Sequence, residues 1–179
     1  MIGAGIATWR KAPDLFIEAA IRSFADSGPR DRFVWIGGEH DDLFPRLLAE
    51  AQRCCPESLR FIGNVDDVVP WLAAADVLLH PARLDAFPLV CLHSALAGTP
   101  VVGFSGTGGL PEMFGGSFVG APYPDLSGLV RSLETMRDPA TRAAVAQAQC
   151  EQVRAVHTTD MAAHLVLAHL QRAAQASTP

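Results

Sequence analysis

The sequence predicts a single α/β domain with a doubly wound, Rossmann-like parallel sheet that is covered by helices on both faces. Short apolar runs alternate along the chain with segments of helical periodicity. The apolar runs show little polar alternation, which is typical of parallel strands buried on both faces. The length of 179 residues and the hydrophobic fraction of 49% fit one domain with its own core. We therefore place one domain at residues 1–174 and a frayed tail at residues 175–179.

The predicted strands are short apolar runs, and each is followed by a glycine, a proline or a polar residue. They lie at residues 2–7, 33–38, 59–63, 77–80 and 100–104, with a candidate sixth at 117–119. The predicted helices carry apolar residues at intervals of three and four, and the first has Pro13 in its first turn. They lie at residues 13–25, 41–54, 66–75, 89–97, 126–136, 139–153 and 161–174. Right-handed crossovers between successive strands then give the doubly wound topology.

Composition and charge argue against several classes of function. The net charge of −5 provides no basic field for nucleic acid or for an anionic membrane surface. No apolar run approaches the roughly 20 residues that span a bilayer, and no charged leader precedes the first strand. The four cysteines include neither a Cys-x-x-Cys pair nor a zinc spacing, which favours reduced thiols and no metal site. We expect a cytoplasmic protein.

A polar loop and a helix follow the fourth predicted strand, at the edge where open parallel sheets bind ligands. Asp85 lies in this loop, where its carboxylate can accept hydrogen bonds from a ligand or cap the following helix. His93 lies eight residues later, on the helix face that it shares with Leu89 and Ala97. A neutral imidazole offers one donor and one acceptor, so His93 can bind a ligand or bond to backbone while half-buried. Both interpretations stay open for each residue.

Two further loops are predicted at the same edge. The loop after the first strand carries Arg10 and Lys11, which can hold a diphosphate beside a helix N-terminus or can be ordinary solvated cations. The loop after the fifth strand has glycines that let backbone N–H groups approach an anion. Alternatively, this loop is a flexible turn, and Glu112 favours the N-terminus of the helix that follows it. The candidate residues of this loop are Ser105, Gly106, Thr107, Gly108, Gly109 and Glu112.

Taken in order, these loops resemble the donor-sugar signature of retaining glycosyltransferases of the GT-B type, the glycosyl transferases group 1 family. Residues 80–102 are similar to Pro-Ser-Arg-x-Glu-x-Phe-x-Leu-x-x-x-Glu-Ala-x-Ala-x-Gly-x-Pro-Val-Val, with Asp85 and His93 at its two acidic positions. The first loop resembles Arg-Lys-Gly-x-Asp-Leu-Phe-Ile, with Ala12 in place of the glycine. Ile6 stands where many relatives carry an arginine.

The resemblance implies the C-terminal, donor-binding half of a GT-B enzyme that transfers a sugar from a nucleoside diphosphate sugar with retention. It implies that Arg10 and Lys11 neutralise the departing diphosphate and that Asp85 orients the sugar, so these three are the expected catalytic residues. The expected substrate-binding residues are Val65, Phe87, Pro88, Leu89, His93, Ser105, Gly106, Thr107, Gly108, Gly109 and Glu112. No metal or cofactor is implied. The implied partner is the acceptor-binding N-terminal half, in the same or another chain, which could also bring the protein to the inner membrane.

Three other classes stay open. Sugar-nucleotide epimerases share this architecture, although residues 87–89 and 98–102 fit transferases better. A non-catalytic scaffold is favoured by His93, which grips a ribose diol less well than a carboxylate would. A flavodoxin-like or receiver-like module would need acidic residues after the first strand, where residues 8–11 are Thr-Trp-Arg-Lys.

Overall fold

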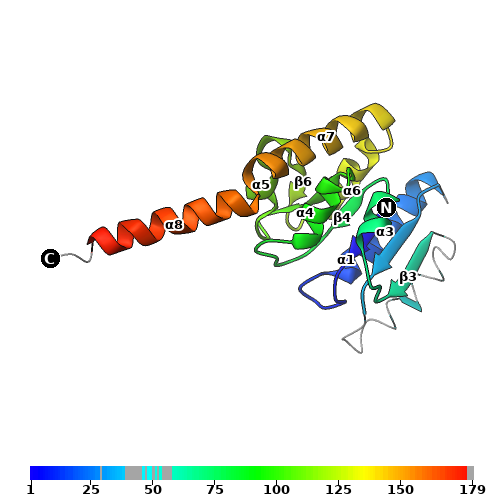
Figure 1. The fold of residues 1–179 in the computed structure, drawn as a ribbon. Coiled ribbons are helices and arrows are strands. Elements are labelled where there is room, and N and C mark those ends of the chain that lie inside the picture. Colours follow the sequence, from blue (N-terminus) through cyan, green and yellow to red (C-terminus); the bar gives the residue numbers. More distant parts are fainter. Residues whose placement is uncertain are drawn as a thin grey trace.

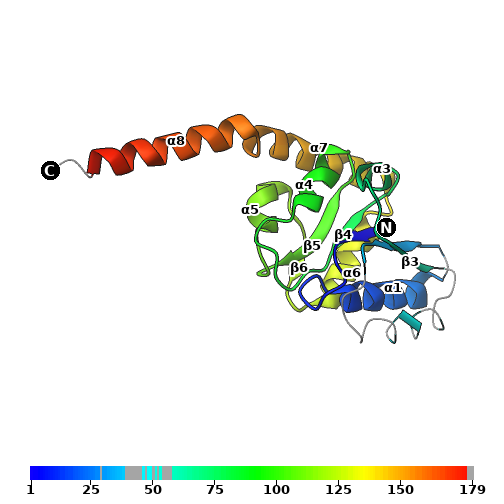
Figure 2. The same cartoon turned by 60° about the horizontal axis from the view of Figure 1, so that its bottom comes forward.

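The computed structural model describes residues 1–28, 30–38, 46, 48–49, 51, 53 and 58–176. These residues include one six-stranded sheet with the order β3-β2-β1-β4-β5-β6, in which all neighbouring strands are parallel. Helices lie on both faces of the sheet (Figures 1 and 2). The predicted doubly wound α/β fold is therefore confirmed.

The strands are short, and only β3 has both of its predicted boundaries. They are β1 Ile2–Ala4, β2 Phe33–Ile36, β3 Leu59–Gly63, β4 Leu78–His80, β5 Val101–Ser105 and β6 Val119–Pro122. β1 ends at Ala4 rather than at residue 7, because the chain turns at Gly5, whose φ is 146°. β2 ends before Gly37, which instead forms an antiparallel bridge with Gly63. The sixth strand begins at Val119 rather than at residue 117, because a 3-10 turn occupies the preceding residues.

The helices also follow the prediction with changes at their ends. They are α1 Pro13–Ser27, α3 Val69–Ala73, α4 Leu89–Leu96, α5 Leu110–Phe114, α6 Leu126–Thr135, α7 Pro139–Val156 and α8 Thr159–Ala176. The helix predicted at 66–75 is shorter, since the Asp67 carboxylate accepts a hydrogen bond from the N–H of Val69 and Pro70 opens the first turn. The helix predicted at 41–54 lies mostly outside the described residues, and so do Cys54 and Cys55.

Each face of the sheet carries its own hydrophobic core. On the face covered by α1 and α6, Phe16 packs edge-to-face on Trp35 with ring centroids 5.2 Å apart. On the face covered by α3, α4, α5 and α7, the core is built around Leu78, Cys91 and Phe114. Burial raises the pKa of the Cys91 thiol well above its ordinary value, so this free cysteine stays protonated. The apolar runs that predict the strands and the buried faces of the covering helices both contribute to the two cores.

A buried glutamine fastens α7 to the sheet. The side chain of Gln149 accepts a hydrogen bond from the N–H of Val101 at 2.7 Å and donates to its carbonyl at 2.9 Å. It also donates to the carbonyl of Ser117 at 3.2 Å. The amide is completely buried, so these bonds satisfy polar groups that would otherwise be costly in the core. Helical periodicity alone gives no sign of this contact.

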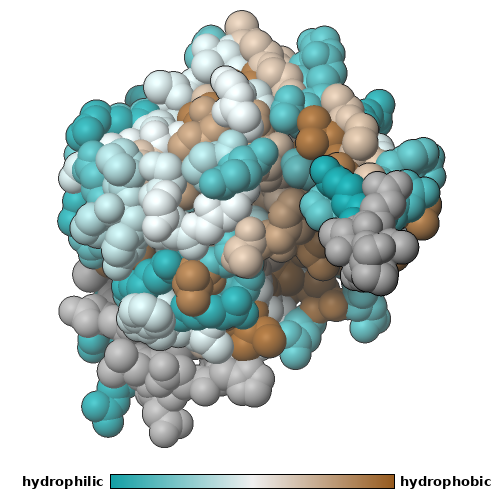
Figure 3. Space-filling model, turned by 90° about the vertical axis from the view of Figure 1, so that its left-hand side faces the viewer, coloured by the Kyte–Doolittle hydropathy of each residue, from teal (hydrophilic) through white to brown (hydrophobic). Residues whose placement is uncertain are grey.

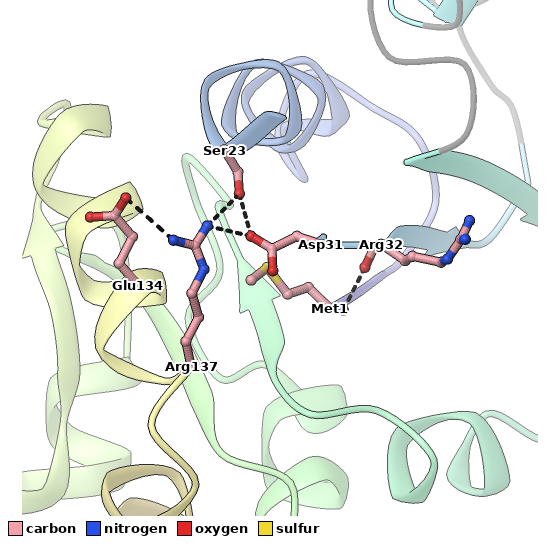
Figure 4. Close-up of polar contacts among 6 residues, drawn as sticks. All are labelled: Met1, Ser23, Asp31, Arg32, Glu134 and Arg137. Carbon is pink, nitrogen blue, oxygen red and sulfur yellow. Dashed lines mark hydrogen bonds and ion pairs between the residues drawn. The ribbon is translucent and has the colours of Figure 1, made fainter. Parts of the chain in front are cut away.

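A polar network lies at the amino ends of the strands (Figure 4). The guanidinium of Arg137, just after α6, pairs with the carboxylate of Asp31 and reaches Ser23 on α1 at 3.2 Å. Burial alone would raise the pKa of Asp31, but hydrogen bonds from Arg137 and Ser23 lower it below its ordinary value. The network joins α1 to the end of α6 at the edge opposite the one where parallel sheets bind ligands.

The last helix, α8, extends away from the rest of the domain (Figures 1 and 2). Its large apolar residues are between 42% and 61% exposed: Met161, Leu165, Val166, Leu167 and Leu170. The helix continues through Ala176, two residues into the predicted tail, and residues 177–179 lie outside the described part of the chain. In the described residues, none of the helices combines the length and hydropathy needed to cross a membrane.

Candidate functional site

A hollow of about 480 Å³ lies at the carboxyl ends of β1, β2 and β3, beside the start of α4. Six of the predicted site residues line it: Lys11, Val65, Asp85, Phe87, Pro88 and Leu89. Most of its wall is apolar, and Ile6, 53% exposed, belongs to that wall. Figure 3 views the molecule from the side toward which α8 projects and shows hydrophobic residues gathered in a hollowed part of this face. The hollow lies where open parallel sheets bind ligands.

Lys11 and Asp85 form an ion pair in the wall of this hollow. The Lys11 ammonium donates to Oδ2 of Asp85, and their side chains are 17% and 12% exposed. The imidazole of His80 lies beneath the pair, with Nε2 3.3 Å from the same oxygen. Burial alone would raise the pKa of Asp85, but the nearby His80 imidazole and the Lys11 ammonium lower it to about 2. Asp85 is therefore an ionised carboxylate at neutral pH.

The backbone at Ala12 explains why the motif resembling this loop has a glycine there. Ala12 is fully buried and precedes α1 in the left-handed conformation, with φ 57° and ψ 52°. This conformation costs a residue with a side chain roughly 1–2 kcal/mol relative to the right-handed region. It turns the chain so that Lys11 points into the hollow and α1 begins directly afterwards.

The two arginines near this pair play different parts. Arg10 is exposed and does not line the hollow, and its carbonyl accepts a hydrogen bond from the N–H of Arg83 at 2.9 Å. The Arg83 guanidinium binds both carboxylate oxygens of Asp14 and lies over the ring of Trp9, 5.3 Å from its centroid. Arg83 thus fastens the loop before α1 to the loop after β4, which keeps Lys11 beside Asp85.

The glycine loop after β5 is joined to the Asp85 loop through its backbone. Asp85 donates its N–H to the carbonyl of Thr107 at 3.0 Å, and Gly109 donates to the carbonyl of Asp85 at 3.2 Å. A Cβ on Gly108 would lie 1.8 Å from the Asp85 carbonyl oxygen, and one on Gly109 would lie 2.2 Å from that of Ala86. These two glycines are required by the contact between loops, whatever else they bind.

The predicted substrate residues divide between two hollows that share Phe87. The second, of about 510 Å³, includes Gly106, Gly108, Gly109 and Glu112. The hydroxyls of Ser105 and Thr107 donate to backbone carbonyls at 3.5 Å, so neither is aimed at the hollow. His157, which follows α7, also lines this hollow and packs against Phe87 with ring centroids 5.3 Å apart.

Three histidines lie differently from what sequence reasoning suggests. In the sequence, His80 and His157 show no metal spacing, which predicts surface or satisfied core residues, yet they lie beside Asp85 and Phe87. His93 is exposed on α4 and is outside the lining of both hollows, which removes the half-buried interpretation. The position of His80 at the end of a strand was the only available signal, and the spacing of His157 gives none.

A ribose contact by His93 stays a prediction, and it leads to a test. Replacing His93 with glutamate is expected to strengthen ribonucleotide binding by about tenfold, because a carboxylate accepts from two vicinal hydroxyls. The change places a charge on an exposed helix face one turn after Leu89, so folding should tolerate it. Isothermal titration with a nucleoside diphosphate and its 2′,3′-dideoxy analogue measures the effect. A gain that also appears with the dideoxy ligand, or no gain, would contradict the ribose contact.

The strand order and the hollow at the carboxyl edge define a doubly wound, Rossmann-like domain, which is the fold of the solved glycosyltransferase domains that superpose on it. The chain belongs to the glycosyl transferases group 1 family, whose family model matches residues 1–137. The resemblance based on the loops is therefore confirmed at the level of the family.

The similar proteins are mostly longer than this chain. It is 30% identical over 124 residues to the D-inositol 3-phosphate glycosyltransferase of Jonesia denitrificans, covering 64% of this chain and 28% of that protein. It superposes on the C-terminal domain of the group 1 protein LpcC from Francisella tularensis with a TM-score of 0.75 at 22% identity, covering 88% and 86%. Anabaena HepE, solved with UDP and glucose, gives a TM-score of 0.73 at 22% identity, covering 86% and 43%. The chain thus spans less than a third of the length of the curated relative from Jonesia denitrificans.

Proposed function

We propose that this domain binds the nucleoside diphosphate sugar donor of a retaining glycosyltransferase. The observation that carries the proposal is the ion pair of Lys11 and Asp85 in the wall of the hollow at the carboxyl edge. A cation and an ionised carboxylate side by side suit a ligand that carries both a diphosphate and sugar hydroxyls. Family membership supports the same activity, and HepE is a protein of this fold that was solved with UDP and glucose.

In this proposal each residue has a stated role. Transfer breaks the bond between the anomeric carbon and a phosphate oxygen. The acceptor oxygen bonds to that carbon from the same face and gives its proton to the departing phosphate oxygen. The Lys11 ammonium stabilises the negative charge that develops on the departing diphosphate. Asp85 accepts hydrogen bonds from sugar hydroxyls, and Arg10 adds positive potential from its exposed position. The base and ribose lie between Val65 and the start of α4, and the Gly106–Gly109 loop faces the phosphates and sugar.

The acceptor side of the cleft is proposed to lie outside residues 1–179. The curated relative from Jonesia denitrificans is matched over 28% of its length, which leaves ample chain for a second domain. The cytoplasmic location, and any attachment to the inner membrane through that second domain, stay predictions.

The 179-residue chain is expected to bind a nucleoside diphosphate weakly and to transfer no sugar by itself. Half of the cleft is missing in this proposal, so affinity in the high micromolar to millimolar range is expected. Calorimetric titration with UDP, GDP and ADP measures binding, and release of diphosphate from sugar nucleotides measures transfer. Sugar transfer by the chain alone would contradict the half-enzyme proposal. A lack of heat with any of the three at millimolar concentration would contradict donor binding.

A second candidate, a non-catalytic domain of the same fold, is favoured by one observation. Ile6 occupies the wall of the hollow where many relatives carry an arginine, so Lys11 is the cation that lines it among the described residues. If the chain binds diphosphates but gives no transfer when combined with a matching acceptor domain, this second candidate is correct.

A further inference from the structure

A buried imidazole faces the candidate catalytic carboxylate from inside the domain. His80 ends β4 and is 5% exposed, and its Nε2 lies 3.3 Å from Oδ2 of Asp85. Among the described residues, Nε2 makes no hydrogen bond of good geometry. Leaving a buried N–H without a partner is costly, which makes this arrangement unusual for a purely structural histidine.

The charge state of this imidazole follows from its surroundings. Burial lowers the pKa of His80, and this outweighs the attraction of Asp85. The thiol of Cys91, in the same core, also stays neutral because burial raises its pKa. The imidazole is therefore neutral and carries one N–H, which can donate to a carboxylate when it is placed on Nε2.

Among the described residues, the side-chain contacts of Asp85 are made by one of its two carboxylate oxygens. Its backbone is fixed by hydrogen bonds to the glycine loop, so rotation of the side chain is the remaining freedom. The contacts with Lys11 and His80 both use Oδ2, and neither uses Oδ1. In the present arrangement the ammonium of Lys11 occupies Oδ2 and leaves Nε2 of His80 without a well-formed bond.

We propose that His80 is a positioning residue that holds Asp85 when the donor binds. The bound diphosphate draws the Lys11 ammonium away from Oδ2, and the Nε2–H of His80 then donates to that oxygen. Asp85 keeps its rotamer, and Oδ1 stays directed at the hydroxyls of the donor sugar. The proposal rests on the donor-binding function, since it requires a ligand that carries a diphosphate and a sugar.

The test compares how variants bind a diphosphate and the matching sugar nucleotide. Calorimetry uses UDP with UDP-glucose, GDP with GDP-mannose and ADP with ADP-glucose, and the readout is the ratio of the two dissociation constants in each pair. His80→Leu is expected to weaken sugar nucleotide binding by about tenfold, the effect of one hydrogen bond to a charged group. Binding of the bare diphosphate should change less than about twofold, because His80 does not reach the phosphates in this proposal.

Matched variants separate positioning from packing. His80→Gln places an amide N–H near the position of Nε2. Its ratio of dissociation constants is therefore expected to lie close to that of the unmodified chain. His80→Asn, whose amide falls short of Oδ2, should behave like His80→Leu and replaces it if the leucine variant does not fold. Asp85→Ala should change the ratio by the same amount, and adding His80→Leu to it should cause no further change, since both act through one contact.

Several results would overturn the proposal. The first is a ratio of dissociation constants that does not change in His80→Leu and His80→Asn. The second is an equal loss of affinity for the diphosphate and the sugar nucleotide. The third is a ratio in His80→Gln that is no closer to that of the unmodified chain than the ratio in His80→Asn. An unchanged ratio in Asp85→Ala would also overturn it, while diphosphate binding would still support donor binding. Failure of the unmodified chain to bind any of the six ligands would instead refute the donor-binding function itself.

Discussion

Replacing Gly108 with alanine is expected to destabilise the fold by about 3 kcal/mol or more. The new Cβ would lie 1.8 Å from the carbonyl oxygen of Asp85, and neither atom can rotate away because the backbone fixes the position of both. Gly108 also has a φ of 152°, which L-residues rarely adopt. Relief of the clash must separate the two loops, which breaks the hydrogen bonds of Asp85 with Thr107 and Gly109. Urea unfolding followed by circular dichroism measures the loss as a lower midpoint.

Gly106→Ala is the matched control for this prediction. Gly106 lies in the same loop with a φ of 81°, but a Cβ there would meet no atom within 4 Å. The control therefore isolates the backbone strain of a positive φ, which is expected to cost about 1 kcal/mol. If both variants lose equal stability, the contact between the loops is not what requires Gly108.

Lys11→Ala is expected to weaken binding of a nucleoside diphosphate by tenfold or more. A hydrogen bond to a charged group contributes about 1.5–3 kcal/mol, and this corresponds to roughly 10- to 150-fold in affinity. Lys11 already lies against Asp85 in the wall of the hollow, so its ammonium is ordered before the diphosphate binds. Calorimetry with the diphosphate and with the bare nucleoside measures the difference, because the nucleoside offers Lys11 no phosphate.

Arg10→Ala is the comparison for Lys11, since it removes an exposed cation from the same loop. Arg10→Ala is expected to lose less diphosphate affinity than Lys11→Ala, because Arg10 attracts the ligand only over a longer distance. This attraction is weaker at high salt. If Lys11→Ala weakens nucleoside and diphosphate binding equally, the residue acts through folding.

The ion pair also supports the fold: its contribution is present above the ordinary Asp85 pKa of 3.8 and is lost as the pH falls towards about 2. This part of the pH dependence of stability should shrink in Lys11→Ala.

The convergence of Lys11 and Asp85 on one edge of the sheet could be anticipated from topology, whereas their ion pair comes from the structure. The two residues are 74 positions apart, but their loops leave the carboxyl ends of β1 and β4, which are neighbours in the sheet. Apolar runs and helical periodicity predict such strands, and parallel pairing brings their loops to one edge. Pattern therefore predicts the fold class and the edge of the sheet at which ligands bind, whereas the adjacency of β1 and β4 comes from the structure.

The contacts that could not be predicted from the sequence depend on side-chain packing. The contacts of His80, Gln149 and Arg83 join residues that no periodicity relates, and each depends on the rotamer and burial found in the folded chain. The glycines show a different limit. A glycine that lets an anion approach and one that lets two loops touch are the same residue in sequence, and Gly108 proved to be of the second kind.

The projecting helix α8 has a thermodynamic consequence for the rest of the molecule. Its residues 159–167 are all exposed, so its helical state depends on local propensity and on i to i+4 contacts rather than on a core. A single helix of this length is only marginally stable in water, and it gains and loses turns within microseconds. Its melting is therefore uncoupled from the cooperative unfolding of the sheet. Circular dichroism of the whole chain then contains two transitions, a broad one from α8 and a sharp one from the domain.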